Sequence, residues 1–196
     1  MFVSFEGIDG CGKSTQAALL AARLRAAGHE VVATREPGGT PLGEGVRGLL
    51  LDGVAMTPWA EAALFAAARA QLVEEVVLPA RARGAWVVCD RFLDSSLAYQ
   101  GGARGLGIDR VLELNRLAIG DVAPDRTILV SVPPEDALAR RAGERADRIE
   151  REGIAFAARV ADAYAELGRR FPERIRVVDG LGTPDEVAAR VEEALA

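Results

Sequence analysis

The chain has 196 residues, the length of one α/β domain, and a formal net charge of −5 at pH 7. This acidic balance argues against a nucleic-acid polymer as the main partner, because domains that bind such polymers carry a basic face. No apolar run reaches the ~18 residues of a membrane-spanning helix, and the sequence begins without a basic and then apolar leader. We therefore expect a cytoplasmic protein with no membrane partner.

Strand-like apolar runs alternate with helical patterns along the chain. The predicted strands are Phe2–Glu6, Val31–Thr34, Trp86–Cys89, Ile128–Val132 and Ile175–Val178. The predicted helices are Ser14–Ala27, Glu44–Leu51, Pro58–Arg83, one within Asp94–Gly120, Gly153–Arg170 and a last one that opens with a capping box at Thr183. This alternation predicts an α/β fold, a doubly wound five-stranded parallel sheet whose ligands bind outside the carboxyl ends of its strands.

A glycine-rich loop follows the first predicted strand and precedes the first helix. Residues Gly7–Ser14 (GIDGCGKS) fit the P-loop pattern G-x-x-x-x-G-K-[ST] at every fixed position. Its main-chain N–H groups and the helix N-terminus favour a phosphate anion, Lys13 would reach the β and γ phosphates, and Ser14 would ligate Mg²⁺. We expect ATP to contact Gly7, Ile8, Asp9, Gly10, Cys11, Gly12, Lys13, Ser14 and Thr15.

Lys13 is the only lysine among the 24 lysine and arginine residues. In a chain that otherwise uses arginine, it indicates a position where a planar guanidinium cannot replace a compact, mobile ammonium. The guanine-reading N-K-x-D motif is therefore absent. This argues against a GTPase-type switch, the alternative from another functional class.

Asp90 and Arg91 directly follow the third predicted strand. An aspartate there can hold Mg²⁺ directly or through water, and the arginine beside it presents a fork suited to phosphate. Phe65 and Arg69 lie four residues apart on a predicted helix, so they share a face that would suit a nucleobase. On spacing alone, a core phenylalanine beside a solvated arginine is the commoner arrangement.

Several segments resemble those of thymidylate (dTMP) kinases and occur in the family's order. They are Phe5–Gln16, Thr34–Thr40 (TREPGGT), Leu64–Gln71 (LFAAARAQ), Asp90–Gly101 (DRFLDSSLAYQG) and Asp147–Glu150 (DRIE). The matches extend over Phe2–Glu150, about three quarters of the chain. Asp90–Gly101 is the most specific of them. The resemblance implies a P-loop nucleoside monophosphate kinase fold, ATP-dependent phosphorylation of dTMP to dTDP, Mg²⁺ and a homodimer.

The resemblance also implies roles for matching residues. Phe65 would stack on thymine, Arg69 would bond its O4 edge, and Tyr99 would pack where a ribose 2′-hydroxyl would sit. Asp9 would approach the 3′-hydroxyl and the magnesium shell. The other expected acceptor contacts are Glu36, Pro37, Arg47, Arg91, Ser95, Ser96 and Gln100, with both arginines near the phosphate. The expected metal ligands are Ser14, Asp90 and Asp9.

The P-loop departs from part of the family, because some members carry a basic residue where Gly10 and Cys11 stand here. The resemblance implies a single domain of residues 1–196, in which residues 136–151 form the family's lid. Arginines of this lid would supply the missing positive charge. Arg140 belongs to this arginine cluster, which could also be a solvated charge run. The expected catalytic residues are Lys13, Arg91, Arg141, Arg145 and Arg148. The open alternative is the same chemistry on another nucleoside monophosphate or on a deoxynucleoside.

Overall fold

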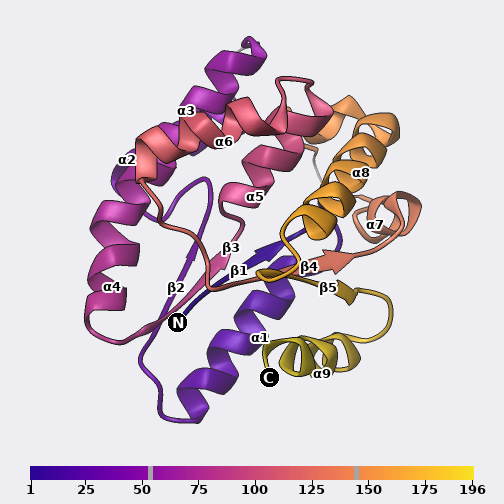
Figure 1. The fold of residues 1–196 in the computed structure, drawn as a ribbon. Coiled ribbons are helices and arrows are strands. Elements are labelled where there is room, and N and C mark those ends of the chain that lie inside the picture. Colours follow the sequence, from indigo (N-terminus) through magenta and orange to yellow (C-terminus); the bar gives the residue numbers. More distant parts are fainter. Residues whose placement is uncertain (53–54, 144–145) are drawn as a thin grey trace.

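The computed structural model describes residues 1–52, 55–143 and 146–196. In this part of the chain, the strands form one parallel sheet in the order β2-β3-β1-β4-β5 (Figure 1). The strands are β1 (Phe2–Glu6), β2 (Val31–Arg35), β3 (Trp86–Asp90), β4 (Arg126–Ser131) and β5 (Ile175–Asp179). The predicted doubly wound sheet is therefore confirmed.

The central strand β1 is buried along its whole length, which explains its nearly continuous apolar sequence. Phe5 of β1 pairs with Asp90 of β3 on one side and with Ile128 of β4 on the other. This register brings the carboxyl ends of three strands together at one edge of the sheet. The P-loop leaves β1 at that edge.

Helices cover both faces of the sheet. They are α1 (Lys13–Ala26), α2 (Pro41–Leu51), α3 (Pro58–Leu72), α4 (Leu78–Ala82), α5 (Leu93–Ser96), α6 (Ile108–Ile119), α7 (Pro134–Arg140), α8 (Ile154–Arg170) and α9 (Pro184–Leu195). The described residues also contain two π-helical segments, η1 (Val73–Val77) and η2 (Leu97–Ala103), and a 3₁₀ turn, η3 (Glu150–Glu152). Figure 1 shows α1 and α9 below the sheet, α5 and α8 above it, and α4 at its left.

Thr-Pro pairs begin three of these helices. The side chains of Thr40, Thr57 and Thr183 accept hydrogen bonds from main-chain N–H groups in the first turns of α2, α3 and α9, and a proline follows each threonine. Proline suits the first helical position because its missing N–H would have no helical partner there. The capping box predicted at Thr183 is confirmed by its reciprocal bonds with Glu186.

Three predicted segments differ from the structure. Where one helix was expected within Asp94–Gly120, the chain forms α5, η2 and α6. The helix expected over Pro58–Arg83 is helical to Ala82, but it consists of α3, η1 and α4 rather than one α-helix. After the predicted strand Ile128–Val132, the structure contains the helix α7, which the sequence analysis did not predict. Pro134 is the first residue of α7.

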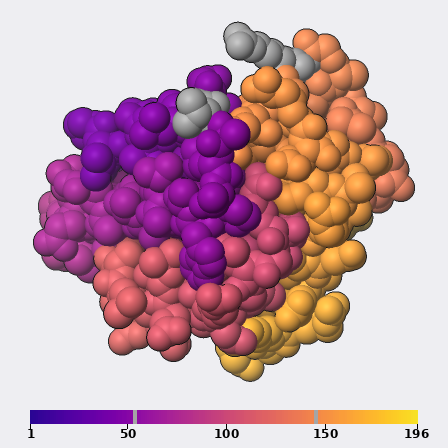
Figure 2. Space-filling view, turned by 90° about the horizontal axis from the view of Figure 1, so that it is seen from above, coloured from indigo at the N-terminus to yellow at the C-terminus, as the bar shows by residue number. Residues whose placement is uncertain are grey.

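Early and late parts of the chain meet at the top of the molecule. In Figure 2 the purple region that includes α2 and α3 lies beside the orange region that includes η3 and α8. One contact between them is the hydrogen bond from Arg148 N to Leu51 O, 3.0 Å long. Within the described residues, no helix has both the length and the apolar character required to cross a bilayer.

Candidate active site

The P-loop borders a cavity of about 550 Å³ at the carboxyl end of β1. Of the predicted ATP contacts, Asp9 to Thr15 line this cavity, whereas Gly7 and Ile8 lie outside its lining. The remaining lining residues, several of which the sequence did not assign, are Gln16, Arg140, Arg141, Glu150, Gly180, Gly182, Pro184 and Val187. These residues come from α1, from the end of α7 and the residue after it, from η3, and from α9 and the loop before it, so the cavity joins distant parts of the chain.

The P-loop conformation depends on glycine at positions where a side chain would not fit. Gly10 has a φ of +85°, and a Cβ there would lie 2.2 Å from the main-chain oxygen of Ala137 in α7. The loop therefore packs directly against α7. This contact holds the arginines at the end of α7 beside the phosphate-binding loop.

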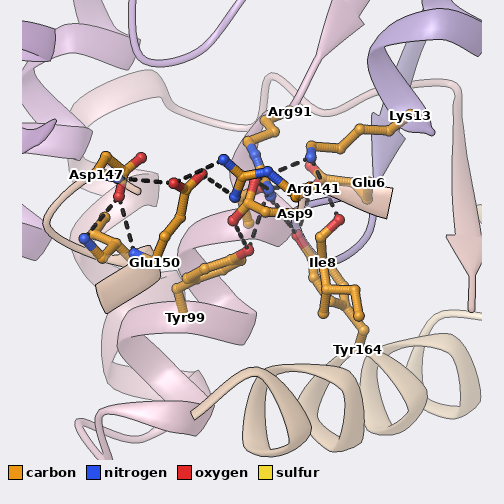
Figure 3. A network of polar contacts seen from close by, with 12 residues as sticks. Glu6, Ile8, Asp9, Lys13, Arg91, Tyr99, Arg141, Asp147, Glu150 and Tyr164 are labelled. Carbon is orange, nitrogen blue, oxygen red and sulfur yellow. Dashed lines mark hydrogen bonds and ion pairs between the residues drawn. The ribbon is translucent and has the colours of Figure 1, made fainter. Parts of the chain in front are cut away.

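Asp9 joins the two cations that the sequence assigned to opposite sides of the reaction (Figure 3). Its Oδ1 lies 3.2 Å from Lys13 Nζ and 2.5 Å from Arg91 Nη2. Burial raises the pKa of Asp9, but the charges of Arg91 and Lys13 outweigh this effect and hold that pKa well below its usual value. Asp9 is therefore ionised and holds both cations at one point.

Arg91 is held by further side chains around its guanidinium. Nη1 donates to Ser95 Oγ at 3.0 Å and to Tyr164 OH at 3.3 Å, and Nη2 donates to Tyr99 OH at 3.1 Å. The guanidinium also lies over the Tyr99 ring, 5.1 Å from its centroid. Such a fixed fork can receive a phosphate with little loss of side-chain entropy.

Glu6, which the sequence did not assign, connects to Arg91 through two hydroxyl groups. Its buried carboxylate accepts hydrogen bonds from Phe92 N at 2.7 Å, Ser95 Oγ at 2.5 Å and Tyr164 OH at 2.8 Å. Burial, with a smaller contribution from the Asp94 charge, raises the pKa of Glu6 to about 7. A glutamate at the end of a mostly apolar strand was the available signal for this role.

A second cavity, of about 130 Å³, adjoins the first. All the predicted acceptor contacts except Arg69 line it, namely Asp9, Glu36, Pro37, Arg47, Phe65, Arg91, Ser95, Ser96, Tyr99 and Gln100. Leu51, Asp147, Ile149 and Glu150 complete the lining. Asp9 and Glu150 line both cavities, so the two spaces meet beside the contact between Lys13 and Arg91.

Arg69 lies outside this lining and has no exposed surface. Its Nε and Nη2 bind the buried carboxylate of Glu36 at 2.9 and 2.6 Å, and Nη2 also donates to Ser96 Oγ at 3.1 Å. Nη1 donates to Asn115 Oδ1. In this structure Arg69 positions Glu36 and Ser96, and its bond to the base edge stays a prediction.

The candidate lid arginines occupy different places. Arg141 lines the P-loop cavity and pairs with Glu150 at 2.5 Å. Arg148 lines neither of these two cavities and pairs with Glu61 at 2.5 Å. Arg145 lies outside the described residues. Arg140, which also lines the P-loop cavity, donates to the main-chain oxygens of Cys11 at 3.3 Å and Gly180 at 2.9 Å.

The residues expected to hold Mg²⁺ differ in whether their side-chain oxygens are available to bind a cation. Asp90 Oδ1 is buried and has no hydrogen-bond partner among the residues that the structure describes, so it can serve a cation. Ser14 is exposed in the P-loop cavity, whereas Asp9 is already bound to two cationic side chains. No cluster of three metal-ligating side chains occurs in the described ranges. Phosphate oxygens and water would therefore complete the coordination of any Mg²⁺.

The P-loop, the parallel sheet and two adjoining cavities with cations at their junction define a P-loop nucleoside monophosphate kinase. The sequence model of the thymidylate kinase family matches residues 5–191. The chain belongs to the thymidylate kinase family. It is a phosphotransferase that phosphorylates dTMP to dTDP with ATP as the phosphoryl donor.

Individual thymidylate kinases are similar in sequence to this chain over nearly its whole length. The thymidylate kinase of Geobacter sp. (strain M21) is 49% identical, over 99% of this chain and 90% of that protein. The thymidylate kinase of Thermomicrobium roseum is 52% identical, over 97% of this chain and 91% of that protein. The crystal structure of thymidylate kinase from Ehrlichia chaffeensis is 34% identical, with a TM-score of 0.82 over 100% of this chain and 97% of that one.

Proposed function

We propose that ATP occupies the P-loop cavity, that dTMP occupies the adjoining cavity, and that the phosphoryl group passes between them beside Asp9. The observation that carries this proposal is that Asp9 lines both cavities and contacts both Lys13 and Arg91. The two cations would then lie on either side of the transferring group. Positioning and charge neutralisation are what phosphoryl transfer requires of a protein.

On the donor side, Lys13 binds the β and γ phosphates and the P-loop amides surround them. Ser14 and Asp90 would hold Mg²⁺, and Asp9 would approach its outer shell. When bound, the metal neutralises charge on the phosphate oxygens. The unpartnered Oδ1 of Asp90 supports this assignment.

On the acceptor side, Arg91 binds the phosphate of dTMP, with Arg47 near it. Phe65 stacks on the base, and Tyr99 packs against the sugar. The attacking phosphate oxygen is already ionised near neutral pH, so the reaction needs no general base. The placement of Arg47, Phe65, Arg91 and Tyr99 around one cavity supports these roles.

Residues 136–151 act as the lid, and Arg141 is the lid arginine that stabilises the transferring group. It lines the P-loop cavity, and its Cγ lies 3.0 Å from the position of a Cβ at Gly10. Arg148 instead pairs with Glu61, at a site that lines neither nucleotide cavity. The homodimer and the cytoplasmic location stay predictions, and light scattering of the purified protein would test the homodimer.

The proposal is tested by replacing Arg91 with alanine. We expect dTMP-dependent ADP release to fall about 10³-fold, by analogy with arginine fingers, because the acceptor phosphate loses its cation. The Kd of ATP should stay within about twofold, since the P-loop is intact. The matched control is Arg110→Ala at an exposed position of α6, where both quantities should be unchanged. Equal loss of ATP binding and of transfer in Arg91→Ala would contradict the assignment.

A further inference from the structure

Glu61 is a buried carboxylate one helical turn before Phe65 on the same face of α3. Its Oε1 accepts hydrogen bonds from Gln100 Nε2 at 2.8 Å and from Arg104 Nε at 2.6 Å. Its Oε2 accepts from Arg148 Nη2 at 2.5 Å. Glu61 therefore joins α3 to the end of η2 and to the segment before η3.

The chemistry of Glu61 restricts the groups that can face it. Burial raises the pKa of Glu61, but hydrogen bonds from Arg104, Gln100 and Arg148 outweigh this effect and lower the pKa below its usual value. The carboxylate is thus ionised at neutral pH and can only accept hydrogen bonds. Any amide beside it must present its nitrogen.

Gln100 is the amide beside it, and it also lines the acceptor cavity with Phe65. An amide has one nitrogen and one oxygen at its end, so the nitrogen bound to Glu61 leaves the oxygen as the remaining polar group. Within the described residues, Gln100 Oε1 makes no hydrogen bond. Turning the amide over would place its oxygen against the carboxylate, which is unfavourable.

We propose that Glu61 is a specificity-determining residue, which binds the Gln100 amide nitrogen and thereby makes Gln100 present a hydrogen-bond acceptor to the base. A hydrogen-bond acceptor at Gln100 Oε1 favours the binding of a base that has an N–H group in its ring over one that has a lone pair at the same ring position. Thymine and uracil carry N–H at N3, whereas cytosine carries a lone pair there. The inference rests on the proposed placement of dTMP beside Phe65 and Gln100.

The test compares Glu61→Gln with Arg104→Gln. The amide introduced by Glu61→Gln could donate or accept a hydrogen bond, so the Gln100 amide would be free to turn over. Arg104→Gln is the control, because it removes another partner of the Glu61 carboxylate but keeps the bond to Gln100. The readout is kcat/KM for dTMP, dUMP and dCMP. In Glu61→Gln the preference for dUMP over dCMP should fall about 10-fold, the effect of one unpaired buried polar group. The preference for dTMP over dUMP should not change, because the amide does not contact the methyl group.

In Arg104→Gln both preferences should stay within about twofold. An unchanged dUMP-to-dCMP preference in folded Glu61→Gln, or an equal fall in Arg104→Gln, would overturn the role of Glu61. Circular dichroism shows whether Glu61→Gln folds. If it does not, the double variant Glu61→Gln/Arg104→Gln takes its place, because it removes one buried cation together with the anion. Its dUMP-to-dCMP preference is then compared with that of Arg104→Gln.

A measurement on the unaltered protein covers the case in which neither Glu61 variant folds. N3-methyl-dUMP cannot donate from N3, so its kcat/KM should be at least about 10-fold below that of dUMP. Equal use of the two nucleotides would overturn the inference. Failure of the unaltered protein to phosphorylate dTMP would instead contradict the proposed function, so the two failures are distinguishable.

Discussion

At the scale of single residues, Arg91 has a main-chain conformation that residues with side chains rarely adopt. Its φ is +70°, in the left-handed region, where a Cβ costs roughly 1–2 kcal/mol. Its N–H donates to Phe5 O at 2.9 Å, and its guanidinium bonds to Asp9, Ser95, Tyr99 and Tyr164. These contacts hold the strained conformation and direct the guanidinium to Asp9.

Comparing Arg91→Gly with Arg91→Ala should therefore separate the effect of main-chain strain at position 91 from the effect of losing the guanidinium. Both should lose about 10³-fold in dTMP-dependent turnover, because both lack the guanidinium. Arg91→Gly should be more stable than Arg91→Ala by about 1 kcal/mol, because glycine adopts a positive φ without the Cβ clash. Urea denaturation of the two variants measures this difference. Equal stability would show that the main chain at position 91 is not strained.

Glu6 predicts a specific dependence of stability on pH. Its pKa is raised in the folded state from 4.5 to about 7, so below pH 4.5 it is protonated in both states. As the pH rises from 4.5 to 7, Glu6 releases its proton in the unfolded chain but keeps it in the folded protein. The folded state is therefore destabilised by on the order of 3 kcal/mol relative to the unfolded state. Glutamine does not titrate, so Glu6→Gln should not show this loss of stability. The free energy of unfolding of wild type relative to Glu6→Gln should fall across this range, and a parallel pH dependence of the two proteins would contradict the account.

At the scale of elements, the contact between the P-loop and α7 gives a prediction with a matched control. Gly10 and Gly28 have φ values of +85° and +87°, but a Cβ at Gly10 meets Ala137 O at 2.2 Å, whereas one at Gly28 meets nothing within 4 Å. The positive φ alone should cost each glycine-to-alanine variant roughly 1–2 kcal/mol of stability, and Gly10→Ala should lose more than Gly28→Ala because its Cβ meets a main-chain oxygen. Only Gly10→Ala should also raise the KM for ATP, by about 10-fold or more, because the loop or α7 must move. Equal KM values in the two variants would show that this packing does not position the loop.

Local sequence signals predicted the elements that depend on local chemistry. The P-loop pattern located the first loop, and the capping box at Thr183 located the start of α9. Contacts between distant residues were not predictable in this way. Arg69 and Phe65 share a face of α3 as their spacing required, but the partner that removes Arg69 from the cavity is Glu36, which is 33 residues away. Tyr164 gave no local signal of its role; it is buried, and its hydroxyl contacts Glu6 and Arg91.

At the scale of the whole molecule, the segment after residue 145 forms part of the proposed acceptor cavity and is joined to α3. Asp147, Ile149 and Glu150 line that cavity, and Arg148 pairs with Glu61. Arg141, by contrast, lies at the P-loop cavity. In the proposed function, Arg141 therefore acts on the ATP side, and Arg148 supports the dTMP side through Glu61.

Arg141→Ala and Arg148→Ala should change different kinetic constants. Arg141→Ala should lower kcat by about 10³-fold, because the transferring group loses a cation. Arg148→Ala should mainly raise the KM for dTMP, because the wall of the acceptor cavity loses its link to Glu61. Steady-state kinetics with each substrate varied in turn measures both effects. A larger fall in kcat for Arg148→Ala than for Arg141→Ala would contradict the assignment of the lid arginine.

The central claim is that ATP and dTMP bind end to end on one chain, with their phosphates meeting at Asp9. Calorimetry with adenosine and thymidine joined 5′ to 5′ by a chain of phosphates tests it most directly. We expect one molecule to bind per chain, and either saturating ATP or saturating dTMP alone to prevent that binding. If ATP prevents binding and dTMP does not, the second cavity is not the acceptor site and the claim is contradicted.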